Sequence, residues 1–269
     1  MQVIEKEIEY KYATAERRLY ALGDIHGGTI HCTEHDIKRK VVEIKADKHA
    51  LWVGVGDYAE FITPSDPRWD GGGIADWVDK EDIGYSQEKW VIELFKPIKA
   101  QCVGMLYGNH EQSIFKHSHQ NVHKHITDAL EVPNLGYSTF IKFSFQRENS
   151  GEKHLITGAF THGAGCAITE GAKLNNLMRF MKSFDADIYG YGHVHDYIPK
   201  SFTRLGLDSN NKIVNKVAIG ATTGSWFRTY TQGIHSSYGE TKCMPPNELC
   251  CAMFTINPST GHLDVQRST

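Results

Sequence analysis

The stretch RLYALGDIHGG, residues 18–28, joins a short apolar run to an aspartate and a histidine that are set among glycines. The same design recurs as ALWVGVGD (50–57), QCVGMLYGNH (101–110), HLITGAFTHG (154–163) and ADIYGYGH (186–193). Apolar runs of this length, bounded by turn residues, are typical of buried strands in a sheet that is covered on both faces. The repetition predicts a layered α/β fold.

Helical patterns lie between several of these runs. The motif TEHD at 33–36 resembles a capping box and precedes apolar residues at helical spacing, so a helix is expected after Thr33. Similar patterns predict a helix capped by Ser86 and another after Thr169. Four histidines follow GNHE, at 117, 119, 123 and 125, and we expect them on the solvated face of one helix.

Two regions break the alternation of strands and helices. Residues 61–82, FITPSDPRWDGGGIADWVDKED, are rich in proline, glycine and acids, which predicts a loop excursion near the end of the preceding strand. Beyond residue 197, β-branched and aromatic runs alternate with turns and predict a mostly antiparallel set of strands. Since no linker or repeat is visible, we expect one domain over residues 1–269.

The composition is that of an ordinary globular protein, with 40% hydrophobic residues, 23% charged residues and a formal charge of −3. No segment is apolar enough to cross a bilayer, and the first 18 residues lack the pattern of a signal peptide, so we expect a cytoplasmic protein without a membrane role. The six cysteines are expected as reduced thiols. Because no dense basic stripe occurs, an anionic substrate must be attracted locally.

Polar residues stand just after the apolar runs, where open α/β sheets place their ligands. They are Asp24, His26, Asp57, Asn109, His110, His162, His193 and His195. Carboxylate, imidazole and amide oxygen together suit borderline divalent ions such as Mn²⁺, Fe²⁺ or Zn²⁺ better than Ca²⁺. Two such ions about 3.5–4 Å apart can share a carboxylate and a hydroxide, which gives a nucleophile at neutral pH and stabilises charge on a phosphoryl group. The pattern therefore predicts a two-metal site.

The ordered series GDIHGG, GDYAE, GNHE, THG and GHVH, from residue 23 to residue 195, resembles the calcineurin-like metallophosphoesterase superfamily. The resemblance implies a four-layer αββα sandwich of two mixed β-sheets flanked by helices, with a dinuclear metal site at the strand C-termini. It implies that the first metal is held by Asp24, His26, Asp57 and His195. It also implies that Asp57 bridges to a second metal, whose ligands are completed by Asn109, His162 and His193.

Two further roles follow from the same resemblance. His110 matches the catalytic histidine near the leaving-group oxygen, and Glu60 stands where an acid commonly holds that histidine. Phe61 occupies the position at which the Ser/Thr protein phosphatases use an arginine for phosphate. This departure, together with GHVH, argues against a protein phosphatase and favours the small phosphodiesterases and repair nucleases.

Three functions remain open at this point. A metal-dependent phosphodiesterase or nuclease comes first, a phosphomonoesterase acting on nucleotides or phosphoproteins is the alternative, and a metal-stabilised scaffold without activity is the third. The expected cofactors are two divalent ions, with Mn²⁺ preferred, and the expected partner is a phosphoester substrate such as a nucleotide or nucleic acid. An arginine beside aromatic residues can grip phosphate and stack a base. On that basis Arg68, Trp226 and Arg228 are substrate-binding candidates, with Asn109 as a fourth, and the alternative for Trp226 is a place in the core of the second sheet.

Overall fold

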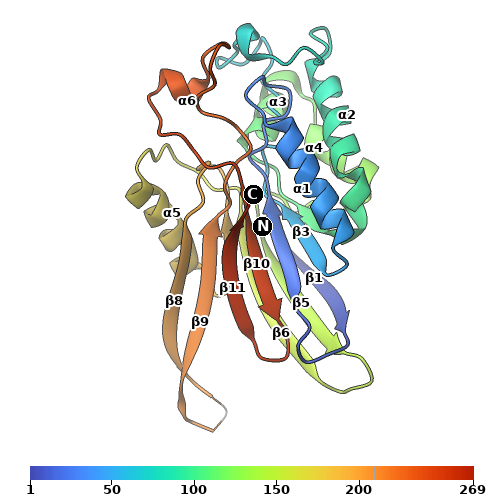
Figure 1. Ribbon diagram of the computed structural model, residues 1–269, viewed down its shortest axis with the longest axis vertical. Coiled ribbons are helices and arrows are strands. Elements are labelled where there is room, and N and C mark those ends of the chain that lie inside the picture. The colour runs from blue at the N-terminus through green and yellow to red at the C-terminus, as the bar shows by residue number, and fades with distance from the viewer. Residues whose placement is uncertain (209) are drawn as a thin grey trace.

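Two mixed β-sheets pack face to face in the computed structural model, which describes residues 1–208 and 210–269 (Figure 1). In spatial order, the six-stranded sheet consists of β1 (Gln2–Tyr10), β5 (Ser138–Arg147), β6 (Lys153–Thr161), β7 (Ile188–Tyr191), β9 (Ile213–Thr222) and β8 (Pro199–Leu207). The five-stranded sheet consists of β11 (His262–Ser268), β10 (Cys251–Asn257), β2 (Arg17–Leu22), β3 (Ala50–Gly54) and β4 (Cys102–Met105).

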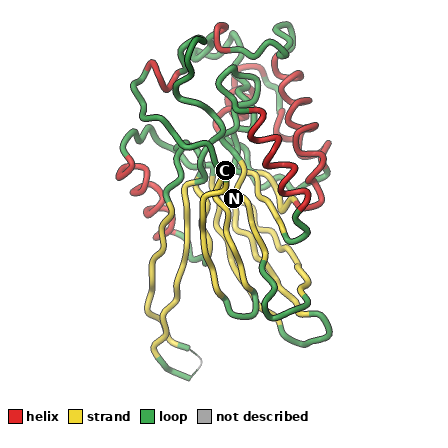
Figure 2. Tube along the Cα trace, viewed as in Figure 1, coloured by secondary structure: helices red, strands yellow, loops and turns green. Residues whose placement is uncertain are grey.

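Helices lie on two sides of the strands, which run from the middle of the molecule to its lower end (Figure 2). The helices are α1 (Glu34–Ala46), α2 (Ile83–Phe95), α3 (Asn109–Ser118), α4 (Val122–Leu130), α5 (Glu170–Ser183) and the short α6 (Tyr238–Thr241), with 3-10 turns at Gly71–Gly73 and Lys96–Gln101. None of the helices within the described ranges is long and apolar enough to span a membrane. All six cysteines are free thiols in the described part of the chain.

Three apolar clusters correspond to the three interfaces between layers. Trp52 packs with the buried faces of α1, α2 and α4 on the outside of the five-stranded sheet. Phe143 and Phe254 lie in the cluster between the sheets, and Leu177 of α5 packs with Tyr189 on the outside of the six-stranded sheet. The predicted αββα sandwich is therefore confirmed.

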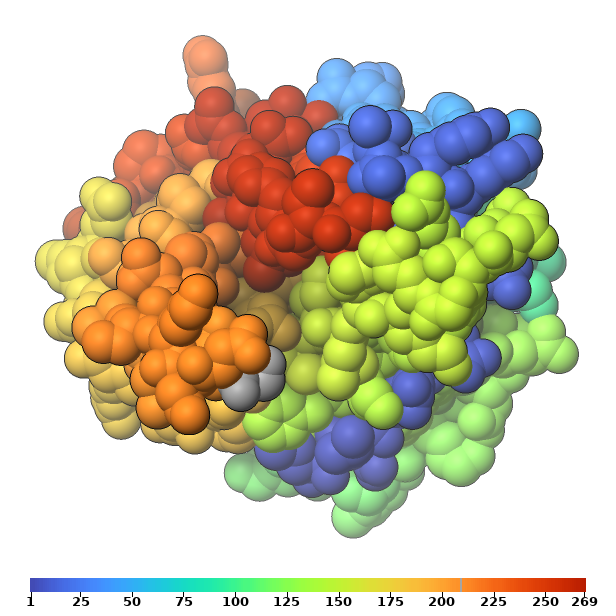
Figure 3. All heavy atoms as spheres, turned by 90° about the horizontal axis from the view of Figure 1, so that it is seen from below, coloured from blue at the N-terminus to red at the C-terminus, as the bar shows by residue number. Residues whose placement is uncertain are grey.

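The parallel strands give the molecule one functional end. β2, β3 and β4 are parallel to one another in one sheet, and β6, β7 and β9 are parallel in the other. Their carboxyl ends all point toward the upper part of Figure 1, where long loops gather. The opposite end is formed by the tips of the β5–β6, β8–β9 and β10–β11 hairpins, coloured yellow-green, orange and red in Figure 3.

Several local predictions need correction. Thr33 does not cap α1 with its side chain, because its hydroxyl donates to the carbonyl of Trp226 (2.8 Å). Helix α2 begins earlier than expected, with Asp82 as its cap in place of Ser86. The expected histidine helix is two helices, α3 and α4, which are separated by residues 119–121, and His123 of α4 is buried instead of solvated. Strands β1 and β5, which pair in parallel, were not predicted at all.

Candidate metal centre

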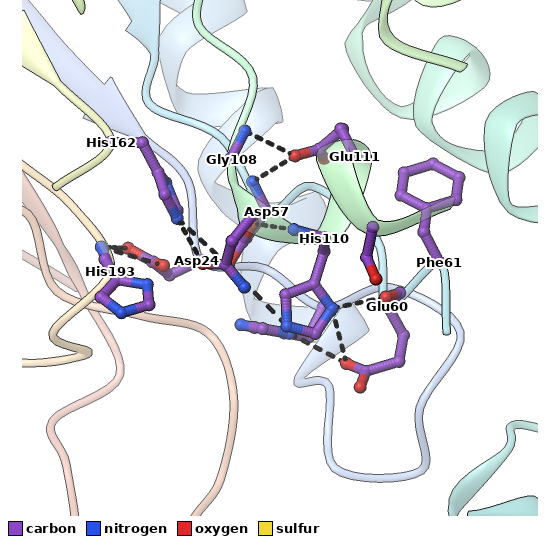
Figure 4. A network of polar contacts seen from close by, with 12 residues as sticks. Asp24, Asp57, Glu60, Phe61, Gly108, His110, Glu111, His162 and His193 are labelled. Atoms are coloured by element: carbon purple, nitrogen blue, oxygen red, sulfur yellow. Dashed lines mark hydrogen bonds and ion pairs between the residues drawn. The ribbon is translucent and has the colours of Figure 1, made fainter. Parts of the chain in front are cut away.

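Loops from both sheets bring the predicted ligands together at the upper strand ends (Figure 4). Asp24 and His26 follow β2, Asp57 follows β3, and Asn109 and His110 follow β4. His162 follows β6 of the other sheet, and His193 and His195 follow β7. The site is thus shared between the two sheets.

One group of donors surrounds Asp24, which is fully buried. Ligand atoms of Asp24, His26 and His195 lie within 4.8 Å of one another. The Nε2 atoms of the two histidines face each other at 3.0 Å, and Nε2 of His195 lies 3.5 Å from Oδ1 of Asp24. The backbone N–H of His193 donates to the same carboxylate at 2.9 Å, so this aspartate also holds the GHVH loop in place.

A second group surrounds Asp57. Ligand atoms of Asp57, His162 and His193 lie within 4.8 Å of one another. Asn109 joins them through its Oδ1, which lies 3.0 Å from Nε2 of His162. The two groups therefore contain the residues that the sequence assigned to the two metals, although Asp57 lies in the second group only.

The hydrogen bonds of His162 show why a cation fits here. Its Nδ1–H donates to the backbone carbonyl of Val55 at 2.7 Å, which fixes the tautomer and leaves a lone pair on Nε2. That nitrogen faces two acceptor oxygens, Asn109 Oδ1 at 3.0 Å and Asp57 Oδ2 at 3.3 Å. Three electron-rich atoms repel one another unless a proton or a metal ion lies among them. Imidazole, carboxylate and amide oxygen are also donors that suit a borderline divalent ion.

The charge balance of the site leads to the same conclusion. Asp57 is only 1% exposed, and its close partners are imidazoles. Burial opposes ionisation of Asp57, yet the neighbouring His162 and His110 hold its pKa well below the usual range. Burial lowers the pKa of His162, but Asp57 outweighs burial and raises that pKa to about 10. Without a metal, a proton on His162 therefore supplies the positive charge that the buried carboxylate requires.

The backbone at the site is unusual. Five of the candidate ligands have positive φ in the left-handed region, namely Asp24 (48°), His26 (52°), Asp57 (53°), His193 (70°) and His195 (53°). Few residues other than glycine tolerate this region, and aspartate and histidine are among those enriched there. The conformations are held by tertiary bonds, including N–H of Asp24 to the carbonyl of Gly56 (2.9 Å) and N–H of His26 to that of Asp57 (3.1 Å). Such strain is common at functional sites.

Glu60 and His110 form the third corner of the site, with a geometry that differs from the expectation. His110 Nδ1–H donates to the backbone carbonyl of Glu60 at 2.5 Å, whereas the Glu60 carboxylate lies 3.8 Å away from that nitrogen. The carboxylate instead accepts from Nδ1 of His26 at 2.9 Å. The prediction that the Glu60 side chain holds His110 is therefore wrong, because the hydrogen bond to His110 comes from the main-chain carbonyl of Glu60. Glu60 orients a candidate metal ligand with its side chain and His110 with its main chain.

Glu111 supports the site from within the protein, and the sequence reasoning missed it. Its buried carboxylate accepts three backbone N–H groups, from Gly108 (2.7 Å), Tyr58 (2.8 Å) and Asp57 (3.0 Å). It thereby ties the loop after β3 to the loop after β4 (Figure 4). Burial and the neighbouring Asp57 raise its pKa to about 7. The only signal in the sequence was its place in GNHE, where an acid at the third helical position can bond back to the helix start.

The two loops touch so closely that glycine is required. A Cβ on Gly108 would lie 2.1 Å from Oδ1 of Asp57 and 2.7 Å from the ring of His162. The absence of a side chain at this position lets the N–H of His110 reach Oδ1 of Asp57 at 2.9 Å. Helix α3 therefore begins, with Asn109 and His110, directly beside Asp57, the residue expected to bridge the two metals.

The substrate-binding candidates differ in their burial and in their position relative to the site. Trp226 is completely buried in the apolar cluster between the five-stranded sheet and its helices. The prediction that it stacks on a substrate is therefore wrong. Its neighbour Phe227 lies against the rings of His26 and His195, with centroids 5.2 and 5.9 Å away. Arg228 is exposed and stays a candidate. Arg68 lines a groove that also contains Asn109.

No family model matches the sequence, and no curated protein is similar to it. Among solved structures, the chain is similar to a conserved protein of Streptococcus pneumoniae described as a predicted phosphoesterase, with 12% identity, a TM-score of 0.37, and coverage of 94% of this chain and 99% of that one. It is similar to Vps29 of Chaetomium thermophilum, with 10% identity, a TM-score of 0.38 and coverage of 94% of each chain. A Thermotoga maritima protein gives 12% identity, a TM-score of 0.32, and coverage of 94% and 99%. These TM-scores lie below 0.5, so the chemistry of the site follows from its own geometry.

Replacing Glu111 tests its role as the tie between two loops. Glu111→Ala should lower the free energy of unfolding by about 2–4 kcal/mol, because three buried N–H groups lose their acceptor. Glu111→Gln keeps one acceptor oxygen and should lose less. Urea denaturation in EDTA measures the effect without metal binding, and Glu93→Ala on exposed α2 is the control. A loss for Glu111→Ala no larger than for the control would refute this role.

Replacing Glu60 tests the role of its side chain, because the main-chain carbonyl that holds His110 is retained. Glu60→Gln should weaken the affinity for one of the metal ions about 10- to 100-fold, because the charged acceptor of His26 Nδ1 is lost. Chelator competition with Mn²⁺ measures the affinity. Glu88→Gln is a matched control, since Glu88 also accepts from a histidine, His125, but outside the site. Unchanged Mn²⁺ affinity in Glu60→Gln would show that this contact does not support a ligand.

Proposed function

We propose that the protein is a metal-dependent phosphodiesterase that acts on nucleotides or nucleic acid. The observation that carries the proposal is the position of His162 Nε2, which faces two acceptor oxygens beside the fully buried Asp57 and needs a proton or a metal ion between them. A metal ion at that point can replace the proton on His162, and the group around Asp24 offers a second set of the same donors 4.8 Å or less apart.

The residues present suit two divalent ions. Asp24, His26 and His195 would hold one ion, Asn109, His162 and His193 would hold the other, and Asp57 would serve both. We propose Mn²⁺ as the preferred ion and Fe²⁺ or Zn²⁺ as alternatives, because imidazole nitrogen and carboxylate oxygen are mixed in the set. Two bound ions supply an activated water and positive charge beside the phosphoryl oxygens.

His110 is the group that we propose for proton transfer. His110 is held by the carbonyl of Glu60, and Asp57 and Glu60 raise its pKa against the effect of burial, so it is equipped to carry a proton. In this proposal it donates that proton to the leaving-group oxygen. Because His110 Nε2 lies 3.9 Å from Asp57 Oδ2, the proton carrier is adjacent to the proposed bridging ligand.

Two features support a diester over a monoester. Phe61 is fully buried, so the position that would carry a phosphate-binding arginine in a protein phosphatase offers no cation to a phosphate dianion. A groove also leads away from Asn109, which gives room for a second substituent on the phosphate. A phosphomonoesterase is the alternative, and the following assay separates the two.

Activity should require added metal. After treatment with EDTA and dialysis, hydrolysis of bis(4-nitrophenyl) phosphate should be absent and should return with Mn²⁺. We expect kcat/KM for this diester to exceed that for 4-nitrophenyl phosphate about tenfold or more. Asp57→Asn, purified in the same way, controls for contaminating phosphatases. Full activity in excess EDTA would exclude the metal mechanism, and a preference for the monoester would favour the alternative function.

Replacing His110 separates proton transfer from metal binding. His110→Ala should retain both metals while kcat falls about 10²- to 10⁴-fold on a nucleoside ester, the usual contribution of general acid–base catalysis. The loss should be smaller on a nitrophenyl ester, because its acidic leaving group needs little protonation. Metal content by elemental analysis accompanies the kinetics. Equal losses on both esters would exclude His110 as the acid, and loss of a metal would make it a ligand.

A further inference from the structure

A groove of about 740 Å³ adjoins the metal centre. One wall comes from the 61–82 excursion and includes Pro67 and Arg68, while the other is the outer face of α3, with Asn109, Phe115 and Lys116. Because Asn109 belongs both to the groove and to the group around Asp57, the groove begins at the proposed metal ligands. Whatever binds there is contiguous with a phosphate at the centre.

Arg68 is fixed in this groove by a neighbouring acid. Its Nε and Nη2 donate to Asp66 at 3.2 and 2.9 Å. Asp66 is 5% exposed and also accepts the hydroxyl of Ser113 on α3, so the acid is anchored to the opposite wall. Two of the five guanidinium N–H groups are used in this way, and three are left for another anion. A guanidinium group that is already held in position loses little conformational entropy when it binds a phosphate.

The charge and surface of the groove favour an anion with an organic part. Asp66 balances the charge of Arg68, and Lys116 adds a positive charge on the other wall, with His117 beside it. Phe115 is 49% exposed, which is unusual for a large apolar side chain next to charged groups. An exposed ring beside cations offers a surface for a base or sugar whose phosphate is held by the cations.

We propose that this groove binds a second phosphate of the substrate, through Arg68 and Lys116. The inference rests on the proposed phosphodiesterase function and narrows its substrate class. The preferred substrate is a nucleoside diester that carries a further phosphate one sugar away from the bond that is cleaved, as in a nucleic acid strand. Arg68 then determines specificity, and the metal ligands and His110 carry the reaction.

A matched pair of substrates tests the proposal. Thymidine 5′-(4-nitrophenyl phosphate) is compared with the same ester that carries a 3′-phosphate, and the pair with the two positions exchanged covers the opposite orientation. In the Mn²⁺-loaded wild-type protein, the added phosphate should raise kcat/KM about tenfold or more in at least one orientation, the effect of one charge-assisted contact. Most of the gain should appear as a lower KM.

The variants assign the gain to the groove. Arg68→Ala should reduce the preference for the second phosphate to about threefold or less, Lys116→Ala should reduce it in part, and Arg68→Lys should retain some of it. Arg39→Ala is the matched control, because Arg39 is an exposed arginine near an aspartate on α1, outside the groove.

The outcomes distinguish this inference from the function on which it rests. If no member of either pair is hydrolysed, the phosphodiesterase proposal fails. If the wild-type protein hydrolyses the ester with and without the added phosphate equally well in both orientations, the function stands and the second-phosphate site is refuted. If Arg68→Ala lowers kcat/KM equally for both members, Arg68 binds the reacting phosphate itself, and the inference is also refuted.

Discussion

The buried carboxylate of Asp57 is the constraint on which the rest of the site depends. An ionised group with 1% exposure is stable only when hydrogen bonds and positive charge replace its water. The N–H of His110 and the imidazoles of His162 and His110 are placed to do so. To bring these groups within reach, two loops must touch, which requires Gly108 and the acceptor oxygens of Glu111. Burial of one charge therefore dictates the local backbone.

The left-handed conformations at the strand ends have the same origin. A strand that continued straight would carry its next side chains to alternate faces of the sheet. Positive φ at Asp24, His26, Asp57, His193 and His195 turns each loop sharply, so that its side chain points into the shared space. The cost of these conformations is offset by tertiary hydrogen bonds such as that from Asp24 N–H to Gly56. The parallel strands of the two sheets provide the fixed frame for those bonds.

The sequence predicted what depends on local pattern and missed what depends on the tertiary fold. The strands that precede Asp24, Asp57, Asn109, His162 and His193 were found, because apolar runs and glycines mark them directly. Strands β1 and β5 were not, and their parallel pairing joins segments more than a hundred residues apart, which no local pattern describes. Thr33 looked like a helix cap but bonds to the carbonyl of Trp226, and Trp226 looked like a stacking surface but is buried. Which atom of Glu60 meets His110 likewise depends on a turn that no pattern in the sequence describes.

The division of the site between the sheets gives the centre a mechanical role as well. Asp24 and Asp57 leave the five-stranded sheet, whereas His162, His193 and His195 leave the six-stranded sheet, so each proposed ion would have ligands on both sides of the sandwich. His26 and His195 are separated by 169 positions in the chain, so an ion held by both would join two segments that are distant in the sequence. An ion bound to the native site alone would stabilise the closed sandwich by mass action. The proposed metal centre would then also hold the two sheets together, and the stability of their packing would depend on the supply of metal.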